Sequence, residues 1–343
     1  MSTPDGADGA PLRAGIVGCG LMGQKRAAAH GADVLIGCHD RQPDLAAALA
    51  QRYGARACAS LEELLGLAPD VVVVATTHDQ LAPLSCRALE AGAHVLLEKP
   101  AGIGVAEVDA VAAAAAAADR LVKVGFNHRF HPGIRRAVET ARAGRFGEVM
   151  FMRARYGHGG RPGYESEWRA DPARSGGGEL TDQGMHLLDL THWLLGELPL
   201  HSALLRTNFW DMPVEDNAAL LLGQGGSHHR APWAMLHVSW SEWKNMFSME
   251  IYCRTGKLEV HGLHGSYGPQ RLTIHAMKPA LGPPDSETIE YPLEDPSWAA
   301  EWAHFRHAIR GADPGPLLGD LASARWAWTQ VQAAYAGNGY PSP

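Results

Sequence analysis

The chain has 343 residues, of which 46% are hydrophobic and 20% are charged. Because a domain averages roughly 150 residues, this length predicts two domains with enough apolar residues for a core in each. The 30 Lys and Arg residues and 37 Asp and Glu residues give a net charge of −7 and form no basic block, which argues against nucleic-acid binding. The alanine-rich stretch 105–124 contains several charged residues, so no segment predicts a membrane span.

The five cysteines lie scattered without C-x-x-C spacing, so we expect reduced thiols in the core of a cytoplasmic protein. Residues 1–11 are polar and rich in Gly and Pro, which is typical of a tail and not of a targeting peptide. His228 and His229 stand in a Gly/Ser-rich stretch, where we expect a solvated turn.

Strands and helices alternate in the first part of the chain. Apolar runs predict strands at 12–17, 34–38, 71–75, 94–97 and 122–126. Helices are expected after the glycine turn 18–23, at 43–53, at 83–91 and across the alanine run 112–118. Strict alternation at this spacing predicts a doubly wound parallel sheet, so we expect a Rossmann domain over residues 12–126.

The pattern changes after residue 127. Alternating apolar and polar residues predict strands at 149–156, 202–209, 218–222, 234–240 and 247–253. Helices are expected at 134–143, 181–195, 298–310 and 321–336. We therefore expect residues 127–337 to form an α+β domain with a large, mostly antiparallel sheet.

The first chemical signal is the pattern Gly18-x-Gly20-x-x-Gly23 between a strand and a helix. Glycines at this spacing permit a tight turn, close approach of the backbone to a pyrophosphate, and close packing of the helix on the strand. Asp40 follows about 20 residues later, where a carboxylate accepts ribose hydroxyls and repels a 2′-phosphate. This favours NAD, although Arg41 leaves NADP as an alternative. A glycine-rich turn in an ordinary α/β domain is the other interpretation.

The second signal is Glu98-Lys99-Pro100, at the end of an expected strand. The carboxyl ends of parallel strands form the edge where an open α/β sheet binds ligands. A lysine at this edge can donate a hydrogen bond to a substrate oxygen and stabilise negative charge on it. Taken alone, Lys99 is equally consistent with a solvated lysine in a turn.

The third signal is Asp182 and His186, preceded by the glycines at 176–178. Residues four apart lie on one face of a helix, so Asp182 is expected to orient the imidazole as a general base. Asp182 as a helix cap is an alternative. A metal site that includes Asp189 and His192 is not expected, because spacings of four, three and three spread the four side chains around the helix.

Together these motifs resemble the Gfo/Idh/MocA oxidoreductases, which include glucose–fructose oxidoreductase and inositol dehydrogenase. The resemblance extends from residue 12 to residue 337 and rests on four motifs in order: Gly18–Gly23, Glu98–Pro100, Gly125–Phe130, and 176–178 followed by Asp182 and His186. It implies a Rossmann domain followed by a sheet domain whose open face often forms the oligomer contact. It also implies that Lys99, Asp182 and His186 are catalytic, and that Glu98 lies beside the nicotinamide ribose.

The chain departs from the family pattern at two places. The Thr-Pro-Asn turn that the family usually has after its fourth strand reads Thr76-Thr77-His78 here, and Leu81 replaces a later histidine. Asn127 and His128 differ from the inositol dehydrogenases at the matching positions, which argues against a plain inositol substrate.

The expected site residues fall into two overlapping sets. For the cofactor they are Gly18, Gly20, Leu21, Met22, Gly23, Asp40, Arg41, Thr76, Thr77, His78, Glu98 and Lys99. For the substrate they are Lys99, Asn127, His128, Tyr156, His158, Trp168, Arg169, Asp182 and His186.

We therefore expect an NAD-dependent dehydrogenase that oxidises a secondary alcohol of a sugar, a sugar derivative (including nucleotide-linked sugars) or a cyclitol. The expected assembly is a homodimer or homotetramer. Two alternatives stay open: a non-catalytic NAD(P)-binding regulator of the same fold, and glycoside cleavage through transient oxidation with bound NAD.

Overall fold

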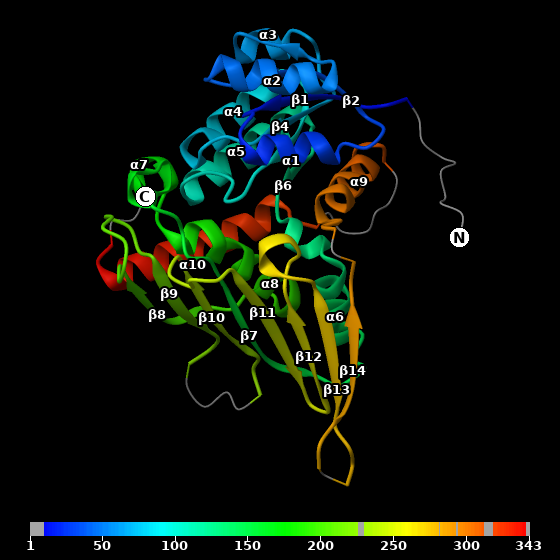
Figure 1. The fold of residues 1–343 in the computed structure, drawn as a ribbon, viewed down its shortest axis with the longest axis vertical. Coiled ribbons are helices and arrows are strands. Elements are labelled where there is room, and N and C mark those ends of the chain that lie inside the picture. Colours follow the sequence, from blue (N-terminus) through cyan, green and yellow to red (C-terminus); the bar gives the residue numbers. More distant parts are fainter. Residues whose placement is uncertain (1–9, 226–229, 281, 293, 312–317, 341–343) are drawn as a thin grey trace.

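The computed structural model describes residues 10–225, 230–280, 282–292, 294–311 and 318–340. Two sheets dominate these residues, with helices between and around them (Figure 1). His228, His229 and all but the last two residues of the expected tail lie outside the described residues. Within the described part of the chain, no helix is long and apolar enough to cross a membrane.

The first domain is a six-stranded parallel sheet in the order β3-β2-β1-β4-β5-β6, as predicted. Its strands are β1 (Arg13–Val17), β2 (Val34–His39), β3 (Arg56–Ala57), β4 (Val71–Val74), β5 (His94–Leu97) and β6 (Val122–Val124). Its helices are α1 (Leu21–Ala29), α2 (Pro43–Tyr53), α3 (Leu61–Leu65), α4 (His78–Glu90) and α5 (Val105–Ala118). The short elements β3 and α3 were not predicted, because two and five residues carry too little periodicity to detect.

Helix α4 begins five residues earlier than predicted. The prediction placed Pro83 in the first turn, but Pro83 lies inside the helix, where the missing N–H leaves one carbonyl without its helical partner. The added first turn buries His78 and Leu81 against the rest of the protein. This extension brings His78 to the edge of the sheet where β4 ends.

The second domain contains an eight-stranded sheet in the order β14-β13-β12-β11-β7-β10-β9-β8. All its neighbours are antiparallel except β7 and β10, so the predicted mostly antiparallel α+β domain is confirmed. The strands are β7 (Val149–Gly157), β8 (Leu200–Arg206), β9 (Asn217–Leu222), β10 (Trp233–Ser239), β11 (Met246–Cys253), β12 (Gly256–His261), β13 (Arg271–Ala276) and β14 (Asp285–Glu290). The last three were not predicted: β12 and β13 alternate as the predicted strands do and were overlooked, whereas β14 is mostly polar and exposed and carries little signal.

Helices pack on one face of this sheet, between it and the first domain (Figure 1). They are α6 (Pro132–Arg142), α8 (Met185–Leu195) and α10 (Leu321–Asn338). A π-helical turn over Leu180–Gly184 leads directly into α8. The buried carboxylate of Asp189 in α8 accepts hydrogen bonds from Arg129 Nε at 2.8 Å and Nη2 at 2.5 Å. This pair ties α8 to the 3₁₀ turn Asn127–Phe130 that follows the first sheet.

Helix α9 (Ser297–Ile309) returns to the first domain and packs against α1. Its Trp302 donates from Nε1 to Asp33 Oδ2 at 2.8 Å and joins the core that includes β1 and β2. In the same helix, the buried Glu301 pairs with Arg26 of α1 at 2.5 Å. These contacts hold the two domains together around the strand ends of the first sheet.

Candidate active site

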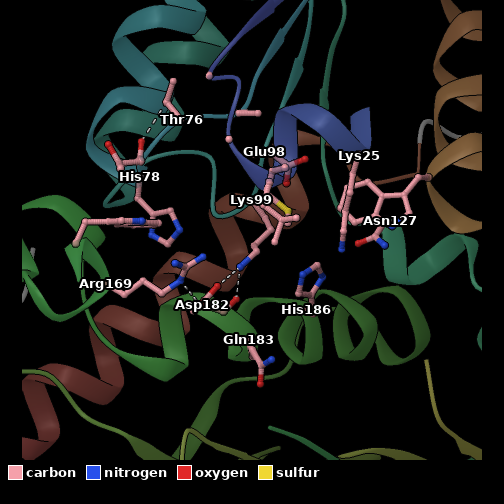
Figure 2. Close-up of a pocket in the computed structure, with 18 of the residues that line it drawn as sticks. Lys25, Thr76, His78, Glu98, Lys99, Asn127, Arg169, Asp182, Gln183 and His186 are labelled. Atoms are coloured by element: carbon pink, nitrogen blue, oxygen red, sulfur yellow. Dashed lines mark hydrogen bonds and ion pairs between the residues drawn. The ribbon is translucent and has the colours of Figure 1, made fainter. Parts of the chain in front are cut away.

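A cleft of about 1350 Å³ lies between the carboxyl ends of the first sheet and the helical face of the second. Figure 2 shows Lys99, Asp182 and His186 near its centre, with His78 and Arg169 to one side and Lys25 and Asn127 to the other. Apart from Gly23, every residue predicted for the cofactor or the substrate lines this cleft.

Each of the three glycines in the turn Gly18–Gly23 is suited to its position for a different physical reason. Gly18 has a φ of +90°, and a Cβ there would lie 2.4 Å from the carbonyl oxygen of Ala75. A Cβ on Gly23 would lie 1.9 Å from the carbonyl oxygen of Gly18, so Gly23 permits close helix packing and stays out of the cleft. Gly20 caps α1, and a Cβ there would meet no protein atom within 4 Å. The open space at a helix N-terminus suits the close approach of a dinucleotide pyrophosphate.

The Asp40 carboxylate is fixed beside this turn. Its Oδ2 accepts a hydrogen bond from the Cys19 amide at 2.7 Å, and its Oδ1 accepts one from the Gln42 amide at 2.8 Å. The backbone therefore aims the carboxylate at the cleft, where Arg41 is also exposed. This arrangement fits the recognition of an adenosine ribose.

Lys99, two residues beyond β5, joins the two domains. Its Nζ donates to the Asp182 carbonyl oxygen at 2.7 Å and forms an ion pair with Asp182 Oδ1. Arg169 Nε donates to the other carboxylate oxygen at 3.0 Å. Burial alone would raise the pKa of Asp182, but the two cations outweigh it and hold the pKa well below its usual range.

The described residues show no hydrogen bond between Asp182 and His186, so the orienting role expected for Asp182 stays a prediction. The Asp182 carboxylate accepts from Lys99 at Oδ1 and from Arg169 at Oδ2. The intervening backbone is also a π-helical turn at Asp182, which does not follow the α-helical spacing assumed for the prediction. Asp182 makes no capping hydrogen bond at this turn either.

His186 instead stacks on His128, with ring centroids 3.8 Å apart and planes 23° apart. Its Nδ1 is buried and has no hydrogen-bond partner among the described residues. Burial and then the charge of Lys99 lower the pKa of His186 well below its usual value. The imidazole is therefore neutral at physiological pH, as a proton acceptor must be.

Asn127 and His128 form a linked pair under the strand ends. Asn127 donates from Nδ2 to Ser297 Oγ at 2.9 Å, and its Oδ1 lies 3.2 Å from His128 Nδ1. His128 therefore carries its proton on Nδ1 and leaves Nε2 as a buried acceptor without a partner in the described residues. Burial lowers the pKa of His128 well below its usual value, so this ring is neutral as well.

His78 and Trp168 close the opposite side of the cleft. His78 Nδ1 lies 2.7 Å from the Ser175 carbonyl oxygen, and its ring meets Trp168 edge-on at 4.8 Å. Burial lowers the pKa of His78 to about 3. His158 accepts at Nδ1 from the Gly160 amide at 2.9 Å and packs edge-on against Tyr164 at 5.7 Å.

Glu98 lines the cleft and forms an ion pair with Arg26 on the side away from the cleft. Arg26 Nε donates to Glu98 Oε1 at 2.5 Å, and both side chains are buried. Gly125 is required at this contact, since a Cβ there would lie 2.5 Å from Arg26 Nη2. The pair holds the carboxylate beside Lys99 at the end of β5.

Sequence reasoning missed several cleft residues. Gln183 donates from Nε2 to Tyr267 Oη at 2.8 Å, and Lys25 lies 5.0 Å from the centre of the Trp298 ring. Gln183 and Lys25 adjoin recognised motifs and could have been found by that proximity. Four further residues carry no motif and enter the cleft only through the fold: His264, Tyr267 in the 3₁₀ turn that follows it, Asp295, and Trp298 at the start of α9. Within the described residues, no three His, Cys, Asp or Glu side chains gather as ligands for a metal ion.

Comparison with protein families identifies both domains. Residues 12–126 match the oxidoreductase family with an NAD-binding Rossmann fold, and residues 134–259 match the GFO/IDH/MocA C-terminal domain. The chain therefore belongs to the GFO/IDH/MocA oxidoreductase family.

Individual relatives are dehydrogenases. Levoglucosan dehydrogenase of Pseudarthrobacter phenanthrenivorans is 28% identical over 64% of this chain and 61% of its own length. Inositol 2-dehydrogenase 4 of Saccharopolyspora erythraea is 34% identical over 54% of each chain. These matches thus span between half and two thirds of the curated relatives. The crystal structure of GenD2 from gentamicin A biosynthesis, in complex with NAD, superposes with a TM-score of 0.81 at 25% identity, covering 99% of this chain and 97% of that one.

The buried neutral histidines make stability depend on pH. Below pH 6.5 the unfolded chain protonates His128 while the folded protein does not, so this residue destabilises the fold progressively as the pH falls. We expect the stability of wild type relative to His128→Phe, which keeps a stacking ring, to fall by about 1 kcal/mol between pH 7.5 and pH 5.5. Urea unfolding at a series of pH values measures this difference.

His201→Phe, on the exposed part of β8, is the matched control for exchanging an imidazole for a phenyl ring. Parallel pH profiles for wild type and His128→Phe would contradict a neutral, buried His128.

Proposed function

We propose that the protein is an NAD-dependent dehydrogenase acting on a secondary alcohol of a sugar, a sugar derivative or a cyclitol. The observation that carries this proposal is the meeting of Lys99 with Asp182 and His186 in one cleft, beside the glycine turn and Asp40. The dehydrogenase relatives support the same reaction class.

Three side chains have different roles in the oxidation of the alcohol. His186, which is neutral and lines the cleft, accepts the hydroxyl proton. Lys99 donates a hydrogen bond to the same oxygen and stabilises its developing negative charge. Asp182 acts on Lys99, which it holds at the cleft by ion pair and carbonyl contact. The nicotinamide, when bound, accepts the hydride.

The dinucleotide would be held by residues of the first domain. The amide-rich turn at Gly20 takes the pyrophosphate, and Asp40 takes the adenosine ribose. The Asp40 carboxylate selects NAD, because a 2′-phosphate would lie against its charge.

The outer face of the second sheet presents the surface for a homodimer. On this face Trp233 is 40% exposed and Met235 39% exposed. Trp233 stacks on Phe151 at 4.9 Å, and Phe151 stacks on Tyr252 at 4.3 Å, so apolar rings cross the central strands β10, β7 and β11. A contiguous exposed apolar stripe is typical of a protein–protein contact.

We also place the protein in the cytoplasm. The proposed location in the cytoplasm is supported by the cysteines. All five are free thiols, as in reducing compartments.

Replacing His186 with alanine removes the proton acceptor and spares the cofactor turn. We expect kcat for alcohol oxidation to fall by roughly 10²–10⁴ while the affinity for NAD changes little. Lys99→Met should also lower kcat, and the two losses should be less than additive because both groups act on one oxygen. Steady-state NADH formation across a panel of sugars and cyclitols, together with NAD titration, measures both.

His201→Ala, on the exposed part of β8, is the control and should retain full activity. Near-normal turnover in His186→Ala would remove His186 from its role and leave Lys99 as the proton acceptor. Tight NAD binding without turnover of any alcohol would point to a regulator instead.

Asp40→Ser tests the cofactor assignment. The substitution removes the charge that opposes a 2′-phosphate and leaves Arg41 free to approach it. The ratio of kcat/KM for NADP to that for NAD should rise about tenfold or more, equivalent to about 1.4 kcal/mol. A wild-type preference for NADP would show that Asp40 has a different role.

Light scattering tests the proposed dimer. Wild type should have twice the chain mass of 36.8 kDa, and Trp233→Arg should shift the protein toward the single-chain mass. A wild-type protein of single-chain mass at micromolar concentration would contradict the assignment of this face.

A further inference from the structure

His264 occupies a strained position at one end of the cleft. It follows β12 and leads into the 3₁₀ turn Gly265–Tyr267, with a φ of 65° and a ψ of 178°. This region of backbone space is essentially restricted to glycine, and strained residues of this kind gather at ligand sites. The side chain is nevertheless buried, with 2% exposure, and it lines the cleft. The protein thus keeps a histidine, at a cost in backbone strain, at a position whose backbone conformation glycine would adopt without strain.

The hydrogen-bonding capacity of this imidazole is left open. Neither ring nitrogen makes a well-formed hydrogen bond with the described residues, although the Pro292 carbonyl lies near the ring. His131 stacks on His264, with centroids 5.6 Å and planes 21° apart. His131 Nδ1 lies 3.6 Å from Asp295 Oδ1, too far for a hydrogen bond. Buried polar groups without partners point to a missing one, here a ligand.

Both rings are neutral at physiological pH. Burial lowers the pKa of His264, and it lowers the pKa of His131 to about 4 despite the nearby Asp295. A neutral imidazole offers one N–H donor and one acceptor, which is the pattern that a hydroxyl group satisfies.

These rings are continuous with the reaction centre. His131 meets His128 edge-on at 5.4 Å, and His128 stacks on His186. A ligand held by His186 and Lys99 can therefore extend along this wall toward His264.

A carboxylate opposes the binding of an anion beside His131. Asp295 presents a carboxylate to the cleft, and the Lys25 ammonium lies over the Trp298 ring. The Asp295 carboxylate accepts hydrogen bonds from the Ser297 amide at 2.9 Å and from Trp298 Nε1 at 3.0 Å. Its charge would repel a phosphate or carboxylate placed beside His131.

We propose that His264 and His131 form a hydroxyl-binding subsite for an uncharged polyol ring, which narrows the substrate to neutral sugars or cyclitols on this side of the reacting carbon. The subsite rests on the proposed dehydrogenase function. It assigns His264, which carries no sequence motif, a role in substrate specificity.

The substitution His264→Gly separates strain from recognition. Glycine adopts this backbone freely, so the melting temperature should hold or rise, whereas the lost hydrogen bonds should raise KM for the polyol about three- to tenfold with a smaller change in kcat. The probe is the neutral compound that wild type oxidises fastest among myo-inositol, levoglucosan and methyl glucosides. His131→Phe, which keeps the ring contacts without nitrogens, should show the same rise in KM.

Ala68→Gly is the matched control, since Ala68 also has a positive φ of 50° but lies exposed and outside the cleft, so its KM should equal that of wild type. An active wild type with unchanged KM in both His264→Gly and His131→Phe would overturn the subsite and leave the dehydrogenase assignment standing. A lower KM for a monophosphate ester of the same compound would overturn its preference for neutral rings. A wild type that oxidises no member of the panel would overturn the proposed function, and the subsite with it.

Discussion

The ion pair between Lys99 and Asp182 is the contact on which the site depends. Lys99 is supplied by the strand end of the first domain, and Asp182 by the π-helical turn of the second. A buried carboxylate without a partner would be costly, so Lys99 and Arg169 together make this turn stable in its present place. Because α8 follows the turn directly, the same contact positions His186 beside Lys99. At the boundary between the two domains, the reacting alcohol therefore meets the fixed cation of Lys99 and the neutral base His186.

Burial also determines the charges in the cleft, because it controls the protonation of the histidines. Beside the charges of Lys99, Asp182 and Arg169, desolvation keeps His78, His128 and His186 neutral. The neutral rings can donate and accept hydrogen bonds without attracting counter-ions, which suits recognition of hydroxyl groups. Behind them, Arg129 with Asp189 and Arg26 with Glu98 and Glu301 carry buried charges in closed pairs. These pairs fix the backbone from which the cleft residues project.

Local patterns made the fold and much of the site predictable. The glycine turn, Asp40 and Lys99 each follow a buried strand, and the geometry of parallel sheets brings such positions to one edge. The contact between Asp182 and Lys99 was not predicted, because helical spacing pointed to His186 while Lys99 is distant in sequence. His264 was not foreseen, since it carries no motif and reaches the cleft through the pairing of β12 with β13. Non-local contacts of this kind leave no spacing to read in the sequence.

The protonation state of His186 tests the central claim most directly. With histidine labelled by ¹⁵N, the imidazole signals of His186 can be assigned as those absent from His186→Ala and followed from pH 8 downward in the intact protein. We predict that the ring stays neutral through pH 6.5 and protonates only well below it, because burial and Lys99 oppose the charge. Half-protonation at or above pH 6.5 would contradict the account, since it would mean that Asp182 stabilises the imidazolium and is not committed to Lys99.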